Sequence, residues 1–329
     1  MSRRTWPSIA RFVLSVVATT SLGGTVLAQA WPTKPVTIIQ GFPAGSGLDI
    51  VARVIQESLE KDLGQPIVFD YKTGAGGNNA STFVTKAAPD GYTLLMGTAG
   101  THGINAALYK KIPFDVEADF TAIGPVVDVP NVLTVNPEVV DAKDVKDFIA
   151  KIKAEPGKYN FGSTGNGTST HLGFAQFNTV AGLDMVHVPY KGSPEAIQAM
   201  VAKEICCMTA QLQTILGQWK AGKVRLLGVT TKERVSVLAD IPTIGEAALP
   251  GFSSVTWYGF FGPKGLDPAI AAKFNASLRK TLETPAIREK FTSLGNSIRV
   301  ETVEQFRETV KKDRAMWAEV VKKSGASID

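Results

Sequence analysis

Short apolar runs, glycine-rich loops and helical patterns follow one another repeatedly along this chain. An apolar run at 36–40 leads into the loop FPAGSGLD (42–49), and from there apolar residues recur at helical spacing until Gly64. The same order of run, loop and helix begins again at 67–71 and at 92–96. Short strands that alternate with helices form parallel sheets covered on both faces. The sequence therefore predicts an α/β fold.

The alternation resumes beyond Pro130 and predicts a second α/β block. This block includes a helix over 143–153 and the loop GSTGNGTSTH (162–171). Two extended stretches marked by proline, at 126–137 and 249–263, flank the block and are the candidate crossings between domains. A chain of 329 residues most often forms two domains. We predict that 31–130 form the first part of lobe 1, 131–252 form lobe 2, and 253–329 return to lobe 1.

Two helix-start signals mark the C-terminal part of the chain. Asp267 followed by Pro268 is typical of an N-cap and a first helical residue. Thr302 with Gln305 three residues later matches a capping box. The apolar stripes that we expect to face the core are Ile270, Phe274, Leu278 and Leu282 in the first helix, and Val303, Phe306, Val310, Trp317 and Val321 in the second.

The first thirty residues are typical of a targeting signal. Three arginines precede an apolar stretch at 12–27, and AQA (28–30) supplies the small residues that a signal peptidase recognises. A membrane anchor is the alternative, but the uninterrupted apolar part is shorter than the ~20 residues of a spanning helix. We predict a cleaved signal peptide over 1–30 and a mature protein outside the cytoplasm that begins at Trp31.

The charge balance argues against polyanionic partners. The chain has 35 Lys and Arg residues against 30 Asp and Glu residues, a net charge of +5. Without residues 1–30 the net charge falls to +2, because that segment holds three arginines and no acid. A value this small does not favour binding to nucleic acid or to an anionic membrane.

The usual catalytic and metal-binding signatures are missing from the sequence. No G-x-S-x-G or G-x-x-x-x-G-K-[ST] motif occurs, and no glycine-rich loop completes G-x-G-x-x-G. His102, His171 and His187 lie 69 and 16 residues apart, without the spacing that favours zinc. We therefore expect no metal, no cofactor and no enzymatic activity. The alternative is a periplasmic hydrolase that uses His171 or His102, which follow loops rich in Gly, Ser and Thr.

Four strand-to-helix loops share a composition of Gly, Ser, Thr and Asn. They are FPAGSGLD (42–49), TGAGGN (73–78), GTAGTHGIN (97–105) and GSTGNGTSTH (162–171). Such loops gather at the carboxyl ends of the strands in open α/β sheets, and glycine lets the backbone approach a ligand closely. The helix N-terminus that follows offers unpaired N–H groups and a positive dipole end. The loops therefore favour capture of a carboxylate without arginine; the alternative is that their glycines only form tight turns.

Eight segments spread over 31–329 carry a resemblance to a known family. They are WPTKPVTIIQGFPAGSGLDIVAR (31–53), GQPIVFDYKTGAGGN (64–78), AAPDGYTLLMGTAGTHGIN (87–105), YNFGSTGNGTSTHL (159–172), VHVPYKG (186–192), GKVRLLGVT (222–230), IPTIGEAALPGF (241–252) and WAEVVKKSGA (317–326). In this order they resemble the tripartite tricarboxylate transporter solute-receptor family, whose members are also called Bug or TctC-like receptors.

The resemblance implies a two-lobed periplasmic binding protein fold of the Venus flytrap, type II-like kind, in which each lobe is a mostly parallel sheet flanked by helices. It further implies a receptor that closes on a small organic carboxylate and delivers it to a membrane carrier made of a large and a small subunit. A monomer is the expected state for such a shuttle. A receptor that presents its ligand to a membrane sensor kinase is the alternative partner assignment.

The resemblance also implies which residues contact the ligand. From lobe 1 these are Phe42, Ala44, Gly45, Ser46, Gly47, Gly77, Asn78, Thr98, Ala99 and Gly100; from lobe 2 they are Ser163, Thr164, Gly165, Thr168, His171, Tyr190, Thr209, Ala210 and Gln211. Asp49 is expected to cap the following helix instead of touching the ligand.

Departures from the family pattern bear on the ligand. The family usually shows PFPPGG at the first loop, whereas this chain has GFPAGSG (41–47), in which the Ser46 hydroxyl is expected to replace a bridging water. Leu48 stands where a small polar residue is common and predicts a more apolar cleft. TAQ (209–211) lacks the acid that would pair with an amino group. A dicarboxylate or an aromatic carboxylate is therefore favoured over an amino acid.

Two further groups of residues have a structural and a functional interpretation. Adjacent Cys206 and Cys207 are expected to be buried free thiols in a strand over 204–208, where neighbouring side chains face opposite sides; a vicinal disulfide is the alternative in an oxidising compartment. The aromatic residues of WYGFF (257–261) are expected to pack in a strand, with a cleft wall as the second interpretation.

Overall fold

The computed structural model describes Met1, residues 31–324 and residues 327–328, so the predicted signal peptide over 1–30 lies almost entirely outside the described residues. In the described part, ten strands form one sheet. They are β1 (Val36–Gln40), β2 (Ile67–Tyr71), β3 (Thr93–Thr98), β4 (Phe120–Val135), β5 (Asn160–Ser163), β6 (Val186–Pro189), β7 (Cys207–Gln211), β8 (Arg225–Val229), β9 (Val255–Pro263) and β10 (Ser297–Ile298).

The sheet is parallel at its two sides and antiparallel in its middle. Its order is β2-β1-β3-β9-β4-β7-β5-β6, with β8 and β10 also paired to β4. The β1 strand pairs in parallel with β2 and β3, and β5 pairs in parallel with β6 and β7. The long strands β4 and β9 run antiparallel to each other and to their neighbours. The predicted α/β fold is confirmed, and its sheet is mixed because β4 and β9 cross it in opposite directions.

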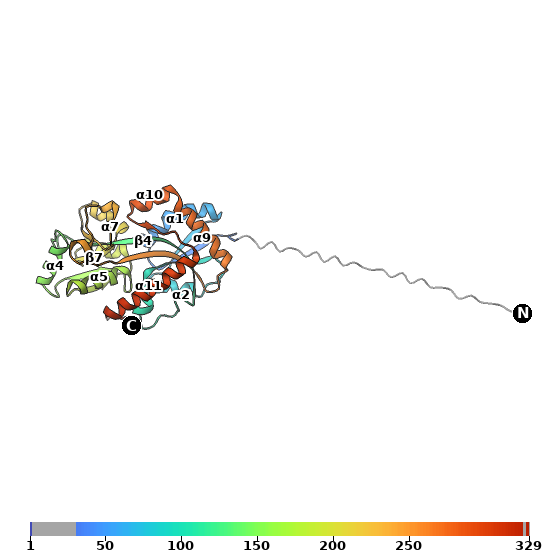
Figure 1. Cartoon of the computed structure of the whole chain (residues 1–329), viewed down its shortest axis with the longest axis horizontal. Helices are drawn as coiled ribbons and strands as arrows, with labels where there is room; N and C mark the ends of the chain where they lie inside the picture. The colour runs from blue at the N-terminus through green and yellow to red at the C-terminus, as the bar shows by residue number, and fades with distance from the viewer. Residues whose placement is uncertain (2–30, 325–326, 329) are drawn as a thin grey trace. The chain divides into compact units, whose positions relative to one another are not determined.

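Helices cover both faces of this sheet. They are α1 (Gly47–Leu63), α2 (Asn78–Val84), α3 (Asn105–Leu108), α4 (Val145–Ala154), α5 (Ser169–Ala181), α6 (Ser193–Val201), α7 (Leu212–Lys220), α8 (Ile244–Ala247), α9 (Pro268–Glu283), α10 (Pro285–Ser293) and α11 (Val303–Ser324), with the short turns η1 (Ala75–Gly77), η2 (Gly100–Ile104) and η3 (Ser236–Leu238). Figure 1 shows β4 running from the helices α1, α9 and α10 toward α4, α5 and α7.

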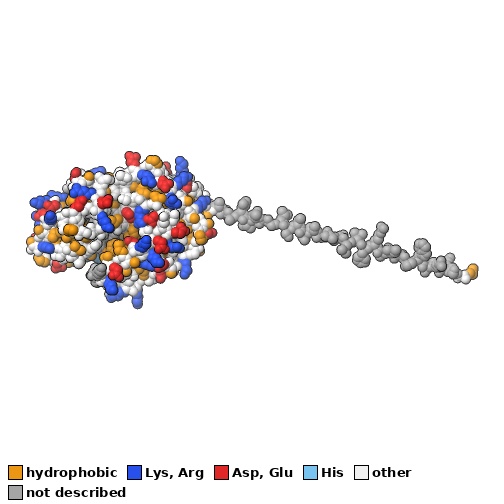
Figure 2. All heavy atoms as spheres, in the orientation of Figure 1, with side chains coloured by type: hydrophobic (Ala, Val, Ile, Leu, Met, Phe, Trp, Pro, Cys, Tyr) orange, Lys and Arg blue, Asp and Glu red, His pale blue; other side chains and the backbone are white. Residues whose placement is uncertain are grey.

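None of the helices among residues 31–324 combines the length and the apolar character needed to cross a membrane. On the face drawn in Figure 2, Lys and Arg side chains are interspersed with Asp and Glu side chains. A surface of mixed sign agrees with the small net charge of the chain beyond residue 30.

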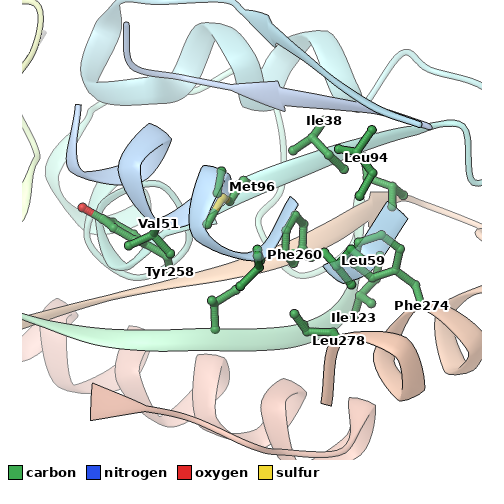
Figure 3. Packing of buried hydrophobic residues seen from close by; sticks show 14 of the residues in the cluster. Ile38, Val51, Leu59, Leu94, Met96, Ile123, Tyr258, Phe260, Phe274 and Leu278 are labelled. Carbon is green, nitrogen blue, oxygen red and sulfur yellow. The ribbon is translucent and has the colours of Figure 1, made fainter. Parts of the chain in front are cut away.

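The first half of the sheet buries a core beneath α1 and α9. Val51, Ile55 and Leu59 recur at helical spacing on α1 and are at most 1% exposed, as the sequence pattern predicts. They pack with Phe274 of α9 and with strand residues that include Phe260 (Figure 3). This core holds α1 rigidly against the sheet, so the N-terminus of α1 has a fixed position.

The second half of the sheet has its own apolar clusters. Phe148 of α4 and Phe174 and Phe177 of α5 are fully buried together on one face. On the other face, Met200 of α6 and Ile215 of α7 are fully buried in a separate cluster. Separate cores in the two halves agree with a two-lobed fold, while the division of the chain at residues 130 and 252 stays a prediction.

Cys206 and Cys207 are free thiols and almost fully buried, as expected. The expectation that their side chains face opposite sides of one strand is wrong, because β7 begins only at Cys207 and Cys206 precedes it. The two sulfur atoms are therefore 3.2 Å apart, and Cys206 Sγ donates to the carbonyl oxygen of Asn160 at 2.9 Å. Burial raises the pKa of the Cys207 thiol well above its usual value, which keeps it in the unreactive thiol form.

The two helix-start signals of the C-terminal part are confirmed. The Asp267 carboxylate accepts a hydrogen bond from Ala269 N at 2.8 Å, with Pro268 at the first helical position of α9. Thr302 and Gln305 form both bonds of a capping box at the start of α11. Phe306 and Trp317 of the predicted apolar stripe are buried, so α11 packs on the sheet along the expected face.

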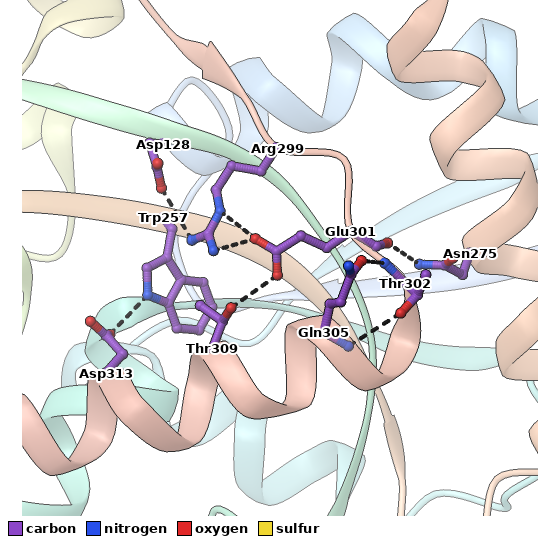
Figure 4. Close-up of polar contacts among 9 residues, drawn as sticks. All are labelled: Asp128, Trp257, Asn275, Arg299, Glu301, Thr302, Gln305, Thr309 and Asp313. Carbon is purple, nitrogen blue, oxygen red and sulfur yellow. Dashed lines mark hydrogen bonds and ion pairs between the residues drawn. The ribbon is translucent and has the colours of Figure 1, made fainter.

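A polar network joins the segment before α11 to the crossing strands. Arg299 pairs with Glu301 and with Asp128 of β4, and Glu301 accepts a hydrogen bond from Thr309 of α11 (Figure 4). The side chains of Arg299 and Glu301 are 17% and 18% exposed. Burial raises the pKa of the Asp128 carboxyl even though Arg299 lowers it. The guanidinium therefore pairs with two carboxylates at once, of which Glu301 is mostly buried and Asp128 is partly exposed.

Substitution Arg299→Ala is expected to lower the free energy of unfolding by about 2 kcal/mol, somewhat less than the loss of one partner from a fully buried ion pair. Urea denaturation measures the change. The matched control is Lys158→Ala, which removes the exposed Lys158–Glu155 pair and should leave stability nearly unchanged. Equal effects of the two substitutions would show that the Arg299 network does not stabilise the fold.

Candidate functional site

The first glycine-rich loop ends in a tightly bonded helix start. Ser46 is the N-cap of α1, and its hydroxyl accepts a hydrogen bond from Asp49 N at 3.3 Å. The Asp49 carboxylate reaches back and accepts a hydrogen bond from Gly45 N at 2.8 Å. Gly45 has φ 76°, a conformation that favours glycine. The expectation that Asp49 caps the helix is wrong, because Ser46 is the N-cap. Asp49 instead accepts a hydrogen bond from Gly45, the residue before the cap.

The loop before α5 repeats this arrangement in the second half of the sheet. Thr168 is the N-cap, and its hydroxyl accepts from His171 N at 3.3 Å. His171 Nδ1 in turn accepts from Gly167 N at 3.3 Å, and Gly167 has φ 77°. Each helix therefore starts with a glycine of positive φ, a hydroxyl cap and a third helical residue that bonds back to that glycine.

This arrangement leaves the same backbone groups available in both helices. The amides at the first two helical positions, Gly47 and Leu48 in α1 and Ser169 and Thr170 in α5, have no carbonyl one turn earlier to bond. The cap hydroxyls serve the third position instead. Two such amides and the positive end of a helix dipole attract an anion. Both helices are long enough, at 17 and 13 residues, for a substantial dipole.

Both helix starts meet at one enclosed cavity. It is narrow in this form, with a volume of about 20 Å³. Its lining residues are Phe42, Ser46, Leu48, Thr98, Thr164, Thr168, Ser169, Ser193, Gln211, Thr256 and Tyr258. All of these side chains are uncharged, so the cavity offers hydrogen-bonding groups and apolar surface without a fixed charge. Larger grooves beside Arg314 and Arg234 are open and are rimmed by charges of both signs.

Contacts between the two halves close the cavity. Gln211 packs directly against Gly47, leaving no room for a side chain at that position. Gln213 Nε2 donates to the carbonyl oxygen of Gly47 at 3.4 Å. A Cβ added to Gly192 would lie 2.7 Å from Pro43, so these two segments also touch. The structure is therefore a closed form with the cavity buried between the halves.

Asp49 is the charged group nearest to the start of α1 in sequence, and its surroundings hold it in the ionised form. Burial opposes ionisation, but the Gly45 amide, the Tyr71 hydroxyl and the Arg53 guanidinium outweigh it and lower the pKa of Asp49. Tyr71 Oη donates to Asp49 at 2.7 Å and Arg53 Nε at 3.0 Å. Arg53 thus neutralises the carboxylate, which leaves the dipole of α1 available to a ligand.

Six of the residues implied by the resemblance line the cavity: Phe42, Ser46, Thr98, Thr164, Thr168 and Gln211. Gly77, Gly165 and Tyr190 line an adjoining open groove instead. Ala44 and Gly45 are exposed, and Gly45 borders a shallow hollow with Pro194. The Ser46 hydroxyl already accepts a hydrogen bond as the helix cap. Its expected role in place of a bridging water would compete with that bond.

The other implied residues do not line the cavity and instead contact neighbouring parts of the protein. The Gln211 side chain packs against Gly47, and Gly100 packs against the Gly167 carbonyl. Asn78 forms a hydrogen bond with Asn105. Thr209 Oγ1 donates to Thr170 O at 2.9 Å. Ala99 and Ala210 are fully buried in apolar clusters. Ser163 contacts His187, and His171 accepts a hydrogen bond from the Gly167 amide.

The histidines do not form the hydrolase site that was the alternative. His102 is fully buried and stacks on Phe261 with ring centroids 3.7 Å apart. His171 stacks on His187 at 3.9 Å and bonds a backbone amide. Ser163 Oγ and His187 Nε2 are 2.6 Å apart, but Ser163 is fully buried and is not among the residues lining the cavity. In the part of the chain that the structure describes, no His, Cys, Asp and Glu cluster could hold a metal ion.

Sequence reasoning missed several lining residues. Ser193 and Thr256 carried no signal beyond their residue type, whereas Ser169 lies in the predicted loop over 162–171 but was not among the residues implied to contact the ligand. Tyr258 belongs to the aromatic strand for which a cleft wall was the second interpretation; it lines the cavity, whereas Trp257 and Phe261 pack on the opposite face. Leu48, expected to make the cleft more apolar, does line it.

The fold and the cavity define a class of protein. The sheet with antiparallel crossing strands, and a cavity closed between its halves, are those of a two-lobed, type II-like periplasmic binding protein. The family model described as "Tripartite tricarboxylate transporter family receptor" matches residues 51–326. The chain therefore belongs to this TctC or Bug family of solute-binding receptors.

Three solved structures are similar over almost the whole chain. The R. palustris protein Rpa4515 with adipate has a TM-score of 0.88 at 30% identity, covering 90% of this chain and 99% of its own. Periplasmic binding protein BugD has a TM-score of 0.86 at 32% identity, with coverage of 90% and 99%. MatC from Rhodopseudomonas palustris with bound malate has a TM-score of 0.84 at 32% identity, with coverage of 88% and 100%.

The stability of the protein is expected to fall as the pH drops from about 6.5 toward 4. Burial lowers the pKa of His171 to about 4 and that of His187 to about 3, where the nearby His171 adds to the effect. These histidines bind protons near pH 6.5 in the unfolded chain but not in the folded protein. The free energy of unfolding is therefore unaffected by them above pH 6.5 and decreases as the pH falls below it. Each such histidine contributes a slope of at most about 1.4 kcal/mol per pH unit.

Urea denaturation at pH 7, 6 and 5 measures this slope. Substitution His171→Gln removes the titrating imidazole and keeps an uncharged acceptor, the side-chain amide oxygen, for the Gly167 amide. The variant should lose less stability than the wild type between pH 7 and pH 5. An unchanged slope would mean that His171 is not the titrating group.

Proposed function

We propose that this protein is a periplasmic receptor that captures a small dicarboxylate in the cavity between its lobes. The observation that supports this most directly is the repeated helix start, which brings two sets of free amides to one cavity from opposite halves of the sheet. Each helix N-terminus suits one carboxylate. A ligand with a carboxylate at each end satisfies both helices and bridges the two halves.

The lining argues for this ligand class against the others considered. An amino acid would bury its ammonium group among uncharged lining residues, which is costly without a paired carboxylate. An aromatic carboxylate would satisfy one helix and leave the amides of the other unpaired. The similar proteins with adipate and with malate each hold a small dicarboxylate, which supports the same choice here.

We further propose that residues 1–30 are removed on export and that the loaded receptor serves a tripartite tricarboxylate-type carrier with a large and a small membrane subunit. The family description supports this partner. A sensor kinase is the alternative partner, and it would use the same loaded, closed form. In both cases the receptor works as a monomeric shuttle between ligand and membrane.

Isothermal titration and thermal-shift screening of the purified protein test the ligand class. The panel holds dicarboxylates of four to six carbons, the monocarboxylates of equal length, aromatic acids, acidic amino acids and uncharged controls. We expect a rise in Tm only with dicarboxylates, because a ligand that binds the folded state alone stabilises it by mass action. Equal binding of a dicarboxylate and its matched monocarboxylate would contradict the two-ended site.

Substitution Ser46→Asp should weaken dicarboxylate binding at least about 100-fold, since placing like charges together costs several kcal/mol. Aspartate is a good N-cap, so Tm without ligand should be nearly unchanged. The matched control is Ser46→Asn, which has the same size and capping ability without the charge and should stay within about tenfold of the wild type. Titration calorimetry compares the three proteins; equal affinities of the two variants would exclude the start of α1 as an anion site.

A further inference from the structure

A second set of contacts joins the two halves of the protein beside the cavity. Tyr109 Oη donates to the carbonyl oxygen of Asn166 at 3.2 Å. A Cβ added to Gly76 would lie 2.2 Å from the same carbonyl oxygen, and a Cβ added to Gly167 would lie 2.2 Å from the Asn105 side chain. Together, Gly76, Asn105, Tyr109, Asn166 and Gly167 form a clasp in which the two backbones are in close contact.

The two sides of the clasp come from different halves of the sheet. Tyr109 follows β3 and α3, whereas the loop that holds Asn166 follows β5. In the sheet order, β9, β4 and β7 lie between β3 and β5. Tyr109, Gly76 and Asn166 line the open groove beside the cavity and are not among the residues that line the cavity itself. The clasp therefore joins the halves only when they are together, and it does so outside the cavity.

The Tyr109 hydroxyl is well placed to make the polar bond of the clasp. Burial raises the pKa of Tyr109 above its usual value, so the phenol is neutral and keeps the proton that it donates. In the described part of the chain, no other donor reaches the Asn166 carbonyl oxygen. When the halves separate, this oxygen loses its protein donor, so the bond belongs to the closed form.

The backbone on both sides of Tyr109 is fixed by Ile328. Ile328 N donates to the Leu108 carbonyl oxygen at 2.9 Å, and Lys110 N donates to the Ile328 carbonyl oxygen at 3.0 Å. These two bonds form a parallel bridge between Tyr109 and Ile328. The phenol therefore projects from a backbone that is already held in place within the first half.

An apolar cluster accompanies the clasp. Leu172 of α5 packs with Leu108 of α3 and with Trp317 and Val321 of α11. Leu172 is 3% exposed and Leu108 is 1% exposed, so this contact between elements of the two halves excludes water. The clasp and the cluster both hold the first turn of α5, which is one of the two helix starts at the cavity. Closure of the halves and the position of that helix start are therefore coupled.

We propose that Tyr109 is a positioning residue that stabilises the closed receptor and slows the release of ligand without touching it. This inference rests on the receptor function proposed above. A bond that exists only in the closed form increases the closed population, and a ligand enclosed by the closed form leaves only after the halves separate. Because Tyr109 acts on closure, its effect is the same for every ligand that the closed cavity encloses.

The variant Tyr109→Phe removes the hydroxyl and keeps the ring. Stopped-flow measurements with malate and with adipate as probes should show a dissociation rate about two- to tenfold higher, the usual contribution of one such hydrogen bond, while the association rate does not fall. The matched control is Tyr159→Phe, which removes a hydroxyl bonded to Glu155 within the second half and should release both probes as the wild type does. A factor that differs between malate and adipate would assign Tyr109 a ligand contact and overturn its positioning role.

The variant Gly76→Ala tests the close contact of the two backbones. Its methyl group would meet Asn166 O in the closed form, so the halves cannot come fully together. Gly76 has φ 60°, and the matched control Gly64→Ala carries similar backbone strain at φ 73° with nothing within 4 Å of the added Cβ. Gly76→Ala should bind malate and adipate about tenfold or more weakly, whereas Gly64→Ala should bind them as the wild type does. Equal affinities of the two glycine variants would exclude this contact from closure.

Distance measurements between two spin labels test the clasp without any ligand. Phe83 of α2 and Val180 of α5 are 45% and 56% exposed, and their helices follow the two sides of the clasp, so labelled cysteines at these positions report separation of the halves. We expect a larger share of long distances in Tyr109→Phe than in the wild type. Equal distance distributions together with unchanged dissociation rates overturn the proposal. Failure of every protein to bind malate or adipate overturns the dicarboxylate function instead, and the distance distributions then decide on the clasp.

Discussion

The antiparallel pairing of β4 with β9 is the constraint on which the rest of the structure depends. Beyond the end of β9, β4 continues into the second half of the sheet, where it pairs with β7 and β8. One strand therefore has hydrogen-bonded partners in both halves and sets the spacing between the parallel strands on either side. The starts of α1 and α5 follow those outer strands, and the cavity lies where they converge. The connecting strand β9 also supplies Thr256 and Tyr258 to the lining of the cavity.

Binding an anion with neutral groups is consistent with what a receptor must do. A buried lysine or arginine would need its own partner in the empty protein, or would be costly to desolvate. Backbone amides at a helix start carry no net charge, and they are held in place by the cap whether or not a ligand is present. The nearby Asp49 is paired with Arg53, and His171 is neutral over most of the physiological range, so neither opposes the dipole field. Anion affinity then comes from geometry that is already formed.

The sequence predicted the elements and the loops better than it predicted the contacts among them. Apolar periodicity was sufficient for α1, and local signals were sufficient for the starts of α9 and α11, because each depends on residues a few positions apart. Thr256 and Tyr258 could not be placed in the same way, since their position in the cavity wall follows from the register of β9 with β3 and β4, strands that are distant in the chain. The side chains of Cys206 and Cys207 were wrongly expected on opposite faces of a strand for a related reason: the apolar run begins at Ile205, but the strand begins only at Cys207.

A few contacts between the halves close the cavity, and a ligand adds to them. They include a long hydrogen bond from Gln213 to Gly47, the packing of Gln211 on Gly47, and the approach of Pro43 to Gly192. A ligand shifts the balance between closed and open forms only by its difference in affinity for the two forms. A dicarboxylate that reaches both helix starts makes both sets of bonds only when the halves are together.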